Sequence, residues 1–161
     1  MCSDTSGIRR FYDSPVESAV EPRATGRCLC GAVTYEVRGP LRDIVLCHCI
    51  ECRRWSGTGA GAFAAAHDDD LVVSGDALRW VESPDSIRNA RRGFCVRCGT
   101  SVFWKAPELE RTGIAAGTLD APTGLRVAAH IYTHQAVDWN ELPEDGLPRD
   151  PETGAIEIRW T

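Results

Sequence analysis

Short stretches in which hydrophobic and polar residues alternate occur along most of the chain after Gly26. The clearest stretch covers 27–37, where β-branched and aromatic residues alternate with polar ones, as in a half-buried strand. Further strands are expected at 44–46, 62–66, 71–74, 78–82, 87–93, 101–105, 113–117 and 127–133. Turn residues such as Gly, Asp and Pro recur between them at intervals of about 8–12 residues, which is typical of an all-β sandwich or barrel.

Three parts of the chain depart from this pattern. Residues 49–55 suit a turn or one helical turn, in which side chains three positions apart face the same way. Residues 1–25 have no sustained period and are expected to be a flexible leader. Residues 149–161 are expected to be a tail, with an edge strand or an ordered flap at 156–160. The sequence therefore predicts one mainly β domain over 26–148, built of antiparallel sheets with few short helical turns.

Composition and charge narrow the possible functions. Hydrophobic residues make up 43% of the 161 residues and charged residues 25%, as in ordinary globular proteins. The net charge of −5 gives no general affinity for phosphates, so no nucleic-acid partner is expected. The positive charge is almost all arginine, with Lys105 the single lysine, and arginine clusters suit a small anionic ligand.

No stretch approaches the ~20 apolar residues of a membrane span, and the N-terminus has no apolar core of a signal peptide. A cytoplasmic protein without membrane contact is therefore expected, and its cysteines should be reduced. Reduced cysteines favour metal binding, while a disulfide framework is the alternative for an exported protein.

Seven of the eight cysteines fall into three motifs, and Cys2 stands apart as an expected free thiol. The motifs are Cys28-Leu29-Cys30, Cys47-His48-Cys49-Ile50-Glu51-Cys52 and Cys95-Val96-Arg97-Cys98. Thiolates at this density suit zinc, which takes four ligands in a tetrahedron. The two outer pairs together supply four thiolates and close one structural site. The central triplet leaves one position open, which is the pattern of catalytic zinc.

Local spacing indicates how each pair reaches an ion. In an extended chain, Cys28 and Cys30 share one face, and Gly31 lets the backbone bend around the metal. The two-residue gap between Cys95 and Cys98 allows backbone N–H groups to donate to the sulfurs. For the central triplet, a second structural zinc with a ligand from elsewhere, or reduced thiols alone, stay open as alternatives.

Several neighbouring residues have two interpretations. His48 alternates with the triplet cysteines, so it is expected to support the site or the core rather than to be the fourth ligand. Glu51 is expected either to orient a ligand or move a proton, or to be a solvated turn residue. The arginines before Cys95 are expected either to attract carboxylates or, as the main expectation, to form a solvated face; they are Arg88, Arg91 and Arg92. His130 and Trp139 are expected either to line a pocket or, as the main expectation, to pack within the fold.

With these motifs in this order, the sequence resembles the glutathione-dependent formaldehyde-activating enzyme family. This family includes the centromere protein V-like proteins and has the Mss4-like β fold. The similarity covers 26–148 and includes downstream features at 116–120, 130–131, Trp139 and 147–148. The resemblance implies a structural zinc on the outer four cysteines and a catalytic zinc on the central three. The activity it implies joins glutathione and formaldehyde to give S-(hydroxymethyl)glutathione.

We therefore expect a zinc-dependent carbon–sulfur lyase-like enzyme whose partners are a small thiol, such as glutathione, and a small aldehyde. In the expected mechanism, the thiol becomes the fourth ligand at Cys47, Cys49 and Cys52, ionises and adds to the carbonyl carbon. The alternative is a non-catalytic zinc-stapled binding module, which would not need an open zinc position. A thiol sensor without metal is a third possibility, and it predicts ready disulfide formation on mild oxidation.

Overall fold

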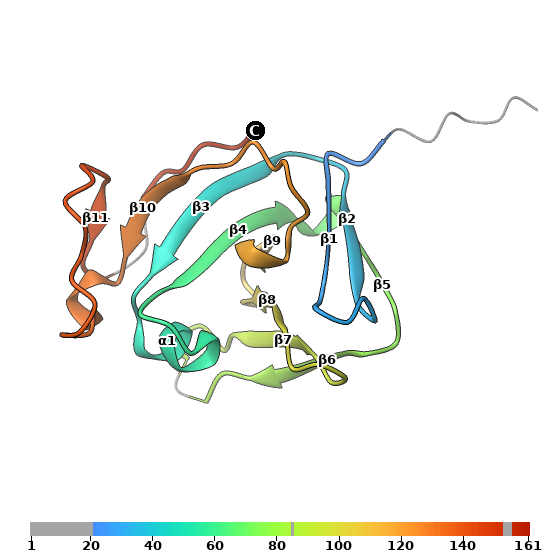
Figure 1. Cartoon of the computed structure of the whole chain (residues 1–161), viewed down its shortest axis with the longest axis horizontal. Coiled ribbons are helices and arrows are strands. Elements are labelled where there is room, and N and C mark those ends of the chain that lie inside the picture. The colour runs from blue at the N-terminus through green and yellow to red at the C-terminus, as the bar shows by residue number, and fades with distance from the viewer. Residues whose placement is uncertain (1–20, 85, 153–155) are drawn as a thin grey trace, which may run out of the picture.

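The computed structural model describes residues 21–84, 86–152 and 156–161, so most of the expected leader lies outside the described residues, as does Cys2. Figure 1 shows the strands and the single α-helix of the described chain. The strands are β1 Ala24–Arg27, β2 Thr34–Val37, β3 Leu41–Cys47, β4 Gly61–His67, β5 Leu71–Ser74, β6 Leu78–Glu82, β7 Arg91–Cys95, β8 Ser101–Lys105, β9 Arg111–Ala115, β10 Val127–Ile131 and β11 Arg149–Asp150. The helix α1 spans Ile50–Ser56, and three single 3-10 turns lie at Asp68–Asp70, Ala116–Thr118 and Thr133–Gln135.

The strands form two sheets, which confirms the prediction of a mainly β fold with few helical turns. One sheet has the order β1-β2-β5, and the other has the order β11-β10-β3-β4-β9-β8-β7-β6. Figure 1 shows the large sheet curving from β11 and β10 round to β7 and β6, with α1 following the end of β3. The prediction of antiparallel pairing holds except at β10, which runs parallel to both β3 and β11.

Two clusters of buried side chains follow from the alternation of side chains along the strands. The first cluster joins the two sheets, and Tyr35 of β2 meets Phe103 of β8 edge-on with ring centroids 5.2 Å apart. The second cluster surrounds Cys47 and Phe63 on the other face of the large sheet. Ala66 belongs to the first cluster and Phe63 to the second, because residues an odd number apart in a strand face opposite ways.

Two expected strands differ in the structure. The stretch 27–37 is interrupted at 28–33 by a turn, in which Gly31 N–H donates to the Cys28 carbonyl over 3.0 Å. Gly31 has φ +75°, which glycine adopts without the steric cost of a Cβ atom, and this explains the break. The strand expected at 87–93 begins only at Arg91, because the Ser86 hydroxyl accepts from Ala90 N–H and closes a turn instead.

The C-terminal residues 156–161 lie beside the start of β3. Leu41 and Thr161 exchange two backbone hydrogen bonds of 2.9 and 2.8 Å. Trp160 stacks on His67, with ring centroids 4.3 Å apart and planes 13° from parallel. The strand-like pairing of this segment with β3 is one isolated bridge, between Arg42 and Trp160. An ordered flap therefore describes the segment better than an edge strand.

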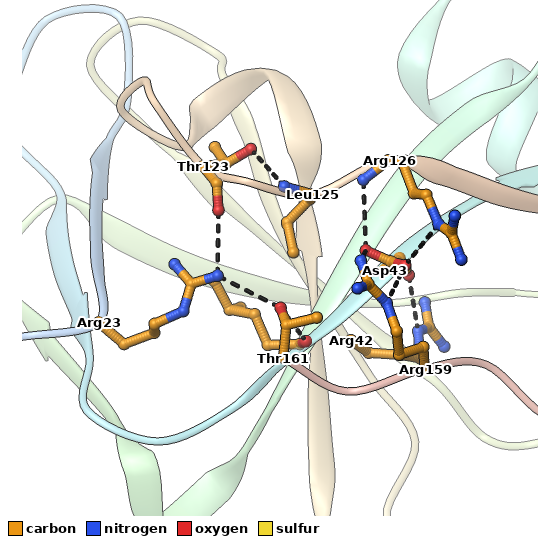
Figure 2. A network of polar contacts seen from close by, with 9 residues as sticks. Arg23, Arg42, Asp43, Thr123, Leu125, Arg126, Arg159 and Thr161 are labelled. Carbon is orange, nitrogen blue, oxygen red and sulfur yellow. Dashed lines mark hydrogen bonds and ion pairs between the residues drawn. The ribbon is translucent and has the colours of Figure 1, made fainter.

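A buried carboxylate attaches the same segment to the sheet. Asp43 of β3 is fully buried, and its side chain accepts hydrogen bonds from Arg126 and Arg159, as Figure 2 shows. The distances are 3.3 Å from Arg126 Nε and 2.9 Å from Arg159 Nε.

Among the described residues, no helix has the length and apolar character that are needed to span a membrane.

Candidate metal centres and the adjoining cavity

Four cysteines from two distant hairpins meet at one point. The sulfur atoms of Cys28, Cys30, Cys95 and Cys98 all lie within 4.8 Å of one another. Cys30 Sγ lies 3.6 Å from Cys28 Sγ and 3.8 Å from Cys95 Sγ. Ligands at ~2.3 Å from a tetrahedral zinc would be about 3.8 Å apart, so this donor set fits a zinc ion.

Two turns hold these sulfurs in place. The β1–β2 turn carries Cys28, whose sulfur accepts from Val33 N–H over 3.3 Å. The β7–β8 turn carries Cys98, whose sulfur lies 3.2 Å from Thr100 Oγ1. The hydrogen bonds with Thr100 lower the pKa of Cys98 to about 5, which favours the thiolate that a metal requires. Because the turns belong to different sheets, this cluster links the small sheet to the large one.

The central triplet forms a second cluster, separate from the first. Cys47 ends β3, Cys49 caps α1 and Cys52 lies within α1, and their sulfurs are also within 4.8 Å of one another. Cys49 Sγ accepts from Cys52 N–H over 3.4 Å at the first turn of the helix. The sequence predicted the same two groups of cysteines, although it placed Cys28 and Cys30 on a strand rather than in a turn.

The electrostatics of the triplet favour a cation. Hydrogen bonding with Cys49 and with Cys52 raises the pKa of the buried Cys47 thiol, whereas hydrogen bonding with Cys47 lowers the pKa of Cys49 to about 2. One sulfur therefore ionises at the expense of its neighbour, because like charges at this distance repel. Three thiolates together need a positive charge among them, and soft metal ions bind such sulfurs. The donor set fits zinc.

Arg92 of β7 is a site residue that the sequence named only as one of three arginines before Cys95. Its side chain is 3% exposed, and its Nε donates to Ser83 Oγ over 2.9 Å. Nη1 and Nη2 lie 3.9 and 3.8 Å from Cys52 Sγ, and Nη2 lies 3.4 Å from Glu51 Oε2. A solvated face was the expectation for this residue, and it is wrong here. The strand period was the available signal, since Cys95 faces the first cluster and Arg92 must therefore face the opposite way.

Glu51 and His48 surround the triplet without joining it. Glu51 Oε2 pairs with Arg92, while Oε1 is buried and has no hydrogen-bond partner among the described residues. His48 is buried, and its Nε2 lies 3.0 Å from His130 Nδ1 rather than beside the sulfurs. Trp139 is 70% exposed, so the expectation that it packs within the fold is wrong, and it does not line the cavity described next.

A cavity of about 270 Å³ opens beside the triplet, on one face of the large sheet. Its walls are largely apolar and include Phe63, Trp104 and Ile131. The charged residues that line it are one carboxylate, Glu51, and four arginines, namely Arg42, Arg88, Arg92 and Arg111. All three triplet cysteines line this cavity, and none of the other four clustered cysteines does. A ligand in the cavity therefore has access to one cluster and not to the other.

The comparison with protein families agrees with this geometry. A family model described as glutathione-dependent formaldehyde-activating enzyme matches residues 23–135. The chain belongs to this family. The match includes both cysteine clusters and confirms the resemblance seen in the cysteine motifs.

Two individual proteins are similar to part of this chain. A Schizosaccharomyces pombe protein described as an uncharacterized lyase is 26% identical over 83 residues, which are 52% of this chain and 58% of that protein. The chain thus spans little more than half the length of this curated relative. A crystal structure of a Rhodobacter sphaeroides protein is 28% identical and covers 60% of this chain and 88% of its own, with a TM-score of 0.49.

Proposed function

We propose that the protein is a zinc-dependent carbon–sulfur lyase-like enzyme that reversibly joins a small thiol, such as glutathione, to an aldehyde such as formaldehyde. The observation that carries this proposal is that the triplet cysteines line a cavity large enough for a small ligand. Membership of the family supports it, as does the relative described as a lyase. A non-catalytic binding module has no need of a cavity at a three-cysteine cluster.

The two clusters have different roles in this proposal. One cluster would hold a structural zinc with Cys28, Cys30, Cys95 and Cys98. These four protein ligands would leave no coordination position for another molecule. Cys47, Cys49 and Cys52 would hold a second zinc and act as the catalytic cluster. When bound there, the zinc supplies a positive charge that lowers the pKa of a neighbouring thiol.

A residue beside the triplet would transfer the proton of the thiol to the carbonyl oxygen. Joining the substrates breaks the S–H bond and forms a C–S bond, while the carbonyl oxygen receives the π electrons and a proton. Glu51 Oε1 is buried, unpartnered within the described ranges and beside the cavity, so it is placed to take the thiol proton and return it to oxygen. Arg92 holds the other oxygen of this carboxylate. No electron is gained or lost overall, so no oxidant is needed.

The test is NMR exchange of labelled formaldehyde with its glutathione adduct, because these compounds also react without an enzyme. Zinc-loaded wild type should accelerate the exchange above this background. Cys52→Ser should return the rate to background and lower the zinc content from about two ions to about one per chain, with unchanged circular dichroism. Cys2→Ser, which alters the one cysteine outside the three sequence motifs, is the matched control and should keep full activity.

The outcomes separate the two candidate functions. A Cys52→Ser variant as active as wild type would disprove the role of the triplet. Equal rates for wild type, variant and buffer would instead favour the binding module. In that case, loss of the triplet zinc should leave partner binding unchanged.

A further inference from the structure

One residue on the cavity has an unfavourable backbone conformation. Tyr132 follows β10 with φ +56° and ψ +41°, which is the left-handed helical region. In this region the Cβ atom comes too close to a carbonyl oxygen, and bulky residues are rarely found there. Asn89 is the other non-glycine residue with positive φ in the described parts of the chain, and asparagine tolerates this region. Strain of this kind gathers at functional sites, so Tyr132 is a candidate for a functional residue.

The strained conformation decides on which side of the sheet the Tyr132 side chain lies. Ile131 lines the cavity, while His130 lies on the opposite side of β10 and meets His48. In a regular strand, alternation would place Tyr132 on the same side as His130. The left-handed turn ends β10 at Ile131 instead, and Tyr132 lines the cavity. Glycine would adopt this conformation without strain, so a tyrosine here is explained if the cavity needs its side chain.

The turn after β10 is fixed to the chain on both sides of Cys49. On one side, His48 N–H donates to the Ile131 carbonyl over 3.0 Å. On the other side, Ile50 N–H donates to Gln135 Oε1 over 2.9 Å. The tyrosine in this turn therefore has a fixed position relative to the triplet.

The register of the strands limits the distance between Tyr132 and the triplet. Ile131 is the partner of Cys47 across the parallel strands β10 and β3, which lie about 4.8 Å apart. Tyr132 is the next residue, so the Cα atoms of Tyr132 and Cys47 are at most about 9 Å apart. Tyr132 and all three triplet cysteines line the same cavity. A small ligand bound at the triplet sulfurs therefore comes within reach of the phenol.

The phenol is suited to donate a hydrogen bond to a ligand. Hydrogen bonding with Glu108 and with Tyr132 raises the pKa of Arg88, which lines the same cavity. A guanidinium only donates, so the phenol oxygen is the acceptor and its hydrogen stays available for a ligand. Hydrogen bonds in such a chain strengthen one another, so the charge of Arg88 makes the phenol a better donor.

We propose that Tyr132 is a catalytic residue whose hydroxyl donates a hydrogen bond to the aldehyde oxygen while the thiolate sulfur attacks the carbonyl carbon. This role rests on the function proposed above. As the C–S bond forms, the π electrons of the carbonyl group move to the oxygen, and the hydrogen bond stabilises the negative charge that develops there. Tyr132 keeps its own proton, and the proton released by the thiol reaches the oxygen through Glu51.

Catalysis is tested with Tyr132→Phe, which removes only the hydroxyl, in the formaldehyde exchange assay. The kcat should fall about 100-fold with unchanged KM, because the hydrogen bond acts on charge that develops in the transition state. Zinc content and circular dichroism should equal those of wild type. Tyr35→Phe is the matched control, because it removes a hydroxyl that lies outside the cavity, 2.7 Å from Thr118 Oγ1. This control should keep the kcat of wild type.

Thermal melting tests the strain without any substrate. Tyr132→Gly and Tyr132→Ala both lose the ring, and only glycine adopts a positive φ without steric cost. The glycine variant should therefore melt about 2–5 °C above the alanine variant. Arg54 is the control position, because it is exposed on α1 and lies outside the cavity. There the order should be reversed, since glycine destabilises a helix relative to alanine.

The outcomes separate the role of Tyr132 from the proposed function. If wild type accelerates the exchange and Tyr132→Phe does so equally, the role of Tyr132 is overturned and the enzymatic function stands. If wild type does not accelerate the exchange, both are overturned. A fall in kcat of the same size in Tyr35→Phe would overturn the role as well, because the position of the hydroxyl would then not matter. An alanine variant that melts at or above the glycine variant would overturn the argument from strain.

Discussion

His48 and His130 share a buried hydrogen bond, in which His48 Nε2 lies 3.0 Å from His130 Nδ1. On its other side, His130 Nε2 lies 2.9 Å from Asp145 Oδ2, and this hydrogen bond holds the pKa of Asp145 below its usual range. Since the carboxylate only accepts, His130 carries its proton on Nε2 and accepts at Nδ1 from His48. The chain of three residues thereby orients His48, which stands between Cys47 and Cys49.

Replacing His130 should destabilise the protein strongly. His130→Ala leaves the buried N–H of His48 without an acceptor and opens a cavity, and each effect costs free energy. We expect the free energy of unfolding to fall by about 2–4 kcal/mol, measured by urea denaturation. His134→Ala, which alters an exposed histidine close by, should change it far less. Equal losses for both variants would show that the hydrogen-bonded chain does not stabilise the fold.

Asp43 should make the stability of the fold depend on pH. Burial favours the neutral carboxyl, but hydrogen bonds from Arg159 and Arg126 outweigh it and lower the pKa of Asp43. The folded-state pKa is thus below the unfolded value of ~3.9, so the stabilisation is present above that value and is lost as the pH falls through the folded-state pKa. Asp43→Asn should lower the free energy of unfolding by about 2–3 kcal/mol at neutral pH. This loss is smaller than the loss on breaking a fully buried ion pair, because both arginines are partly exposed.

Urea denaturation at two pH values checks this expectation. The difference in the free energy of unfolding between wild type and Asp43→Asn should be smaller at about pH 3 than at neutral pH, because the wild-type carboxyl becomes protonated. The matched control is Asp76→Asn, which breaks the ion pair between Asp76 and Arg97. The side chain of Asp76 is 80% exposed. Such an exposed pair contributes about 0–1 kcal/mol. A pH-independent loss in Asp43→Asn would refute the assigned ion pair.

The parts of the site that the sequence predicted are those fixed by local rules. Zinc takes four ligands, so counting cysteines separated four from three without knowledge of the fold. Alternation located most strands to within a few residues, since the side-chain period of a strand is two. A bend at Gly31 was expected, but the interruption of the strand over 28–33 and the turn at 86–90 were missed, because single hydrogen bonds decided them.

The parts that the sequence did not predict depend on the order of strands in the sheet. Periodicity shows which residues of one strand share a face, but not which strands are neighbours. Arg42 and Trp104 face one cavity because β3, β4, β9 and β8 are adjacent. His130 reaches His48 because β10 runs parallel to β3, a pairing that no short turn could have signalled.

Arg92 should control metal binding at the triplet specifically. Its guanidinium contacts Cys52 Sγ and places a positive charge beside the sulfurs, which stabilises the thiolate form that binds metal. Arg92→Gln should weaken zinc binding at this cluster by about 10- to 100-fold, measured by competition with a chromophoric chelator. The neighbouring Arg91→Gln is the control, because Arg91 is exposed and lies over the Trp80 ring. Equal affinities for both variants would exclude a role of Arg92 at the metal.

The two cysteine clusters should differ in what their zinc does for the fold. Cys98 and Cys49 are both half-buried, so exchanging either for serine changes the packing to a similar extent. Cys98→Ser removes a ligand from the cluster that links the two sheets, and zinc in such sites contributes ~10–16 kcal/mol of apparent binding energy in small peptides. We expect this variant to lose its cooperative thermal transition, whereas Cys49→Ser should keep the transition and lose about one zinc ion per chain. If Cys49→Ser unfolds and Cys98→Ser does not, the structural and catalytic roles are assigned to the wrong clusters.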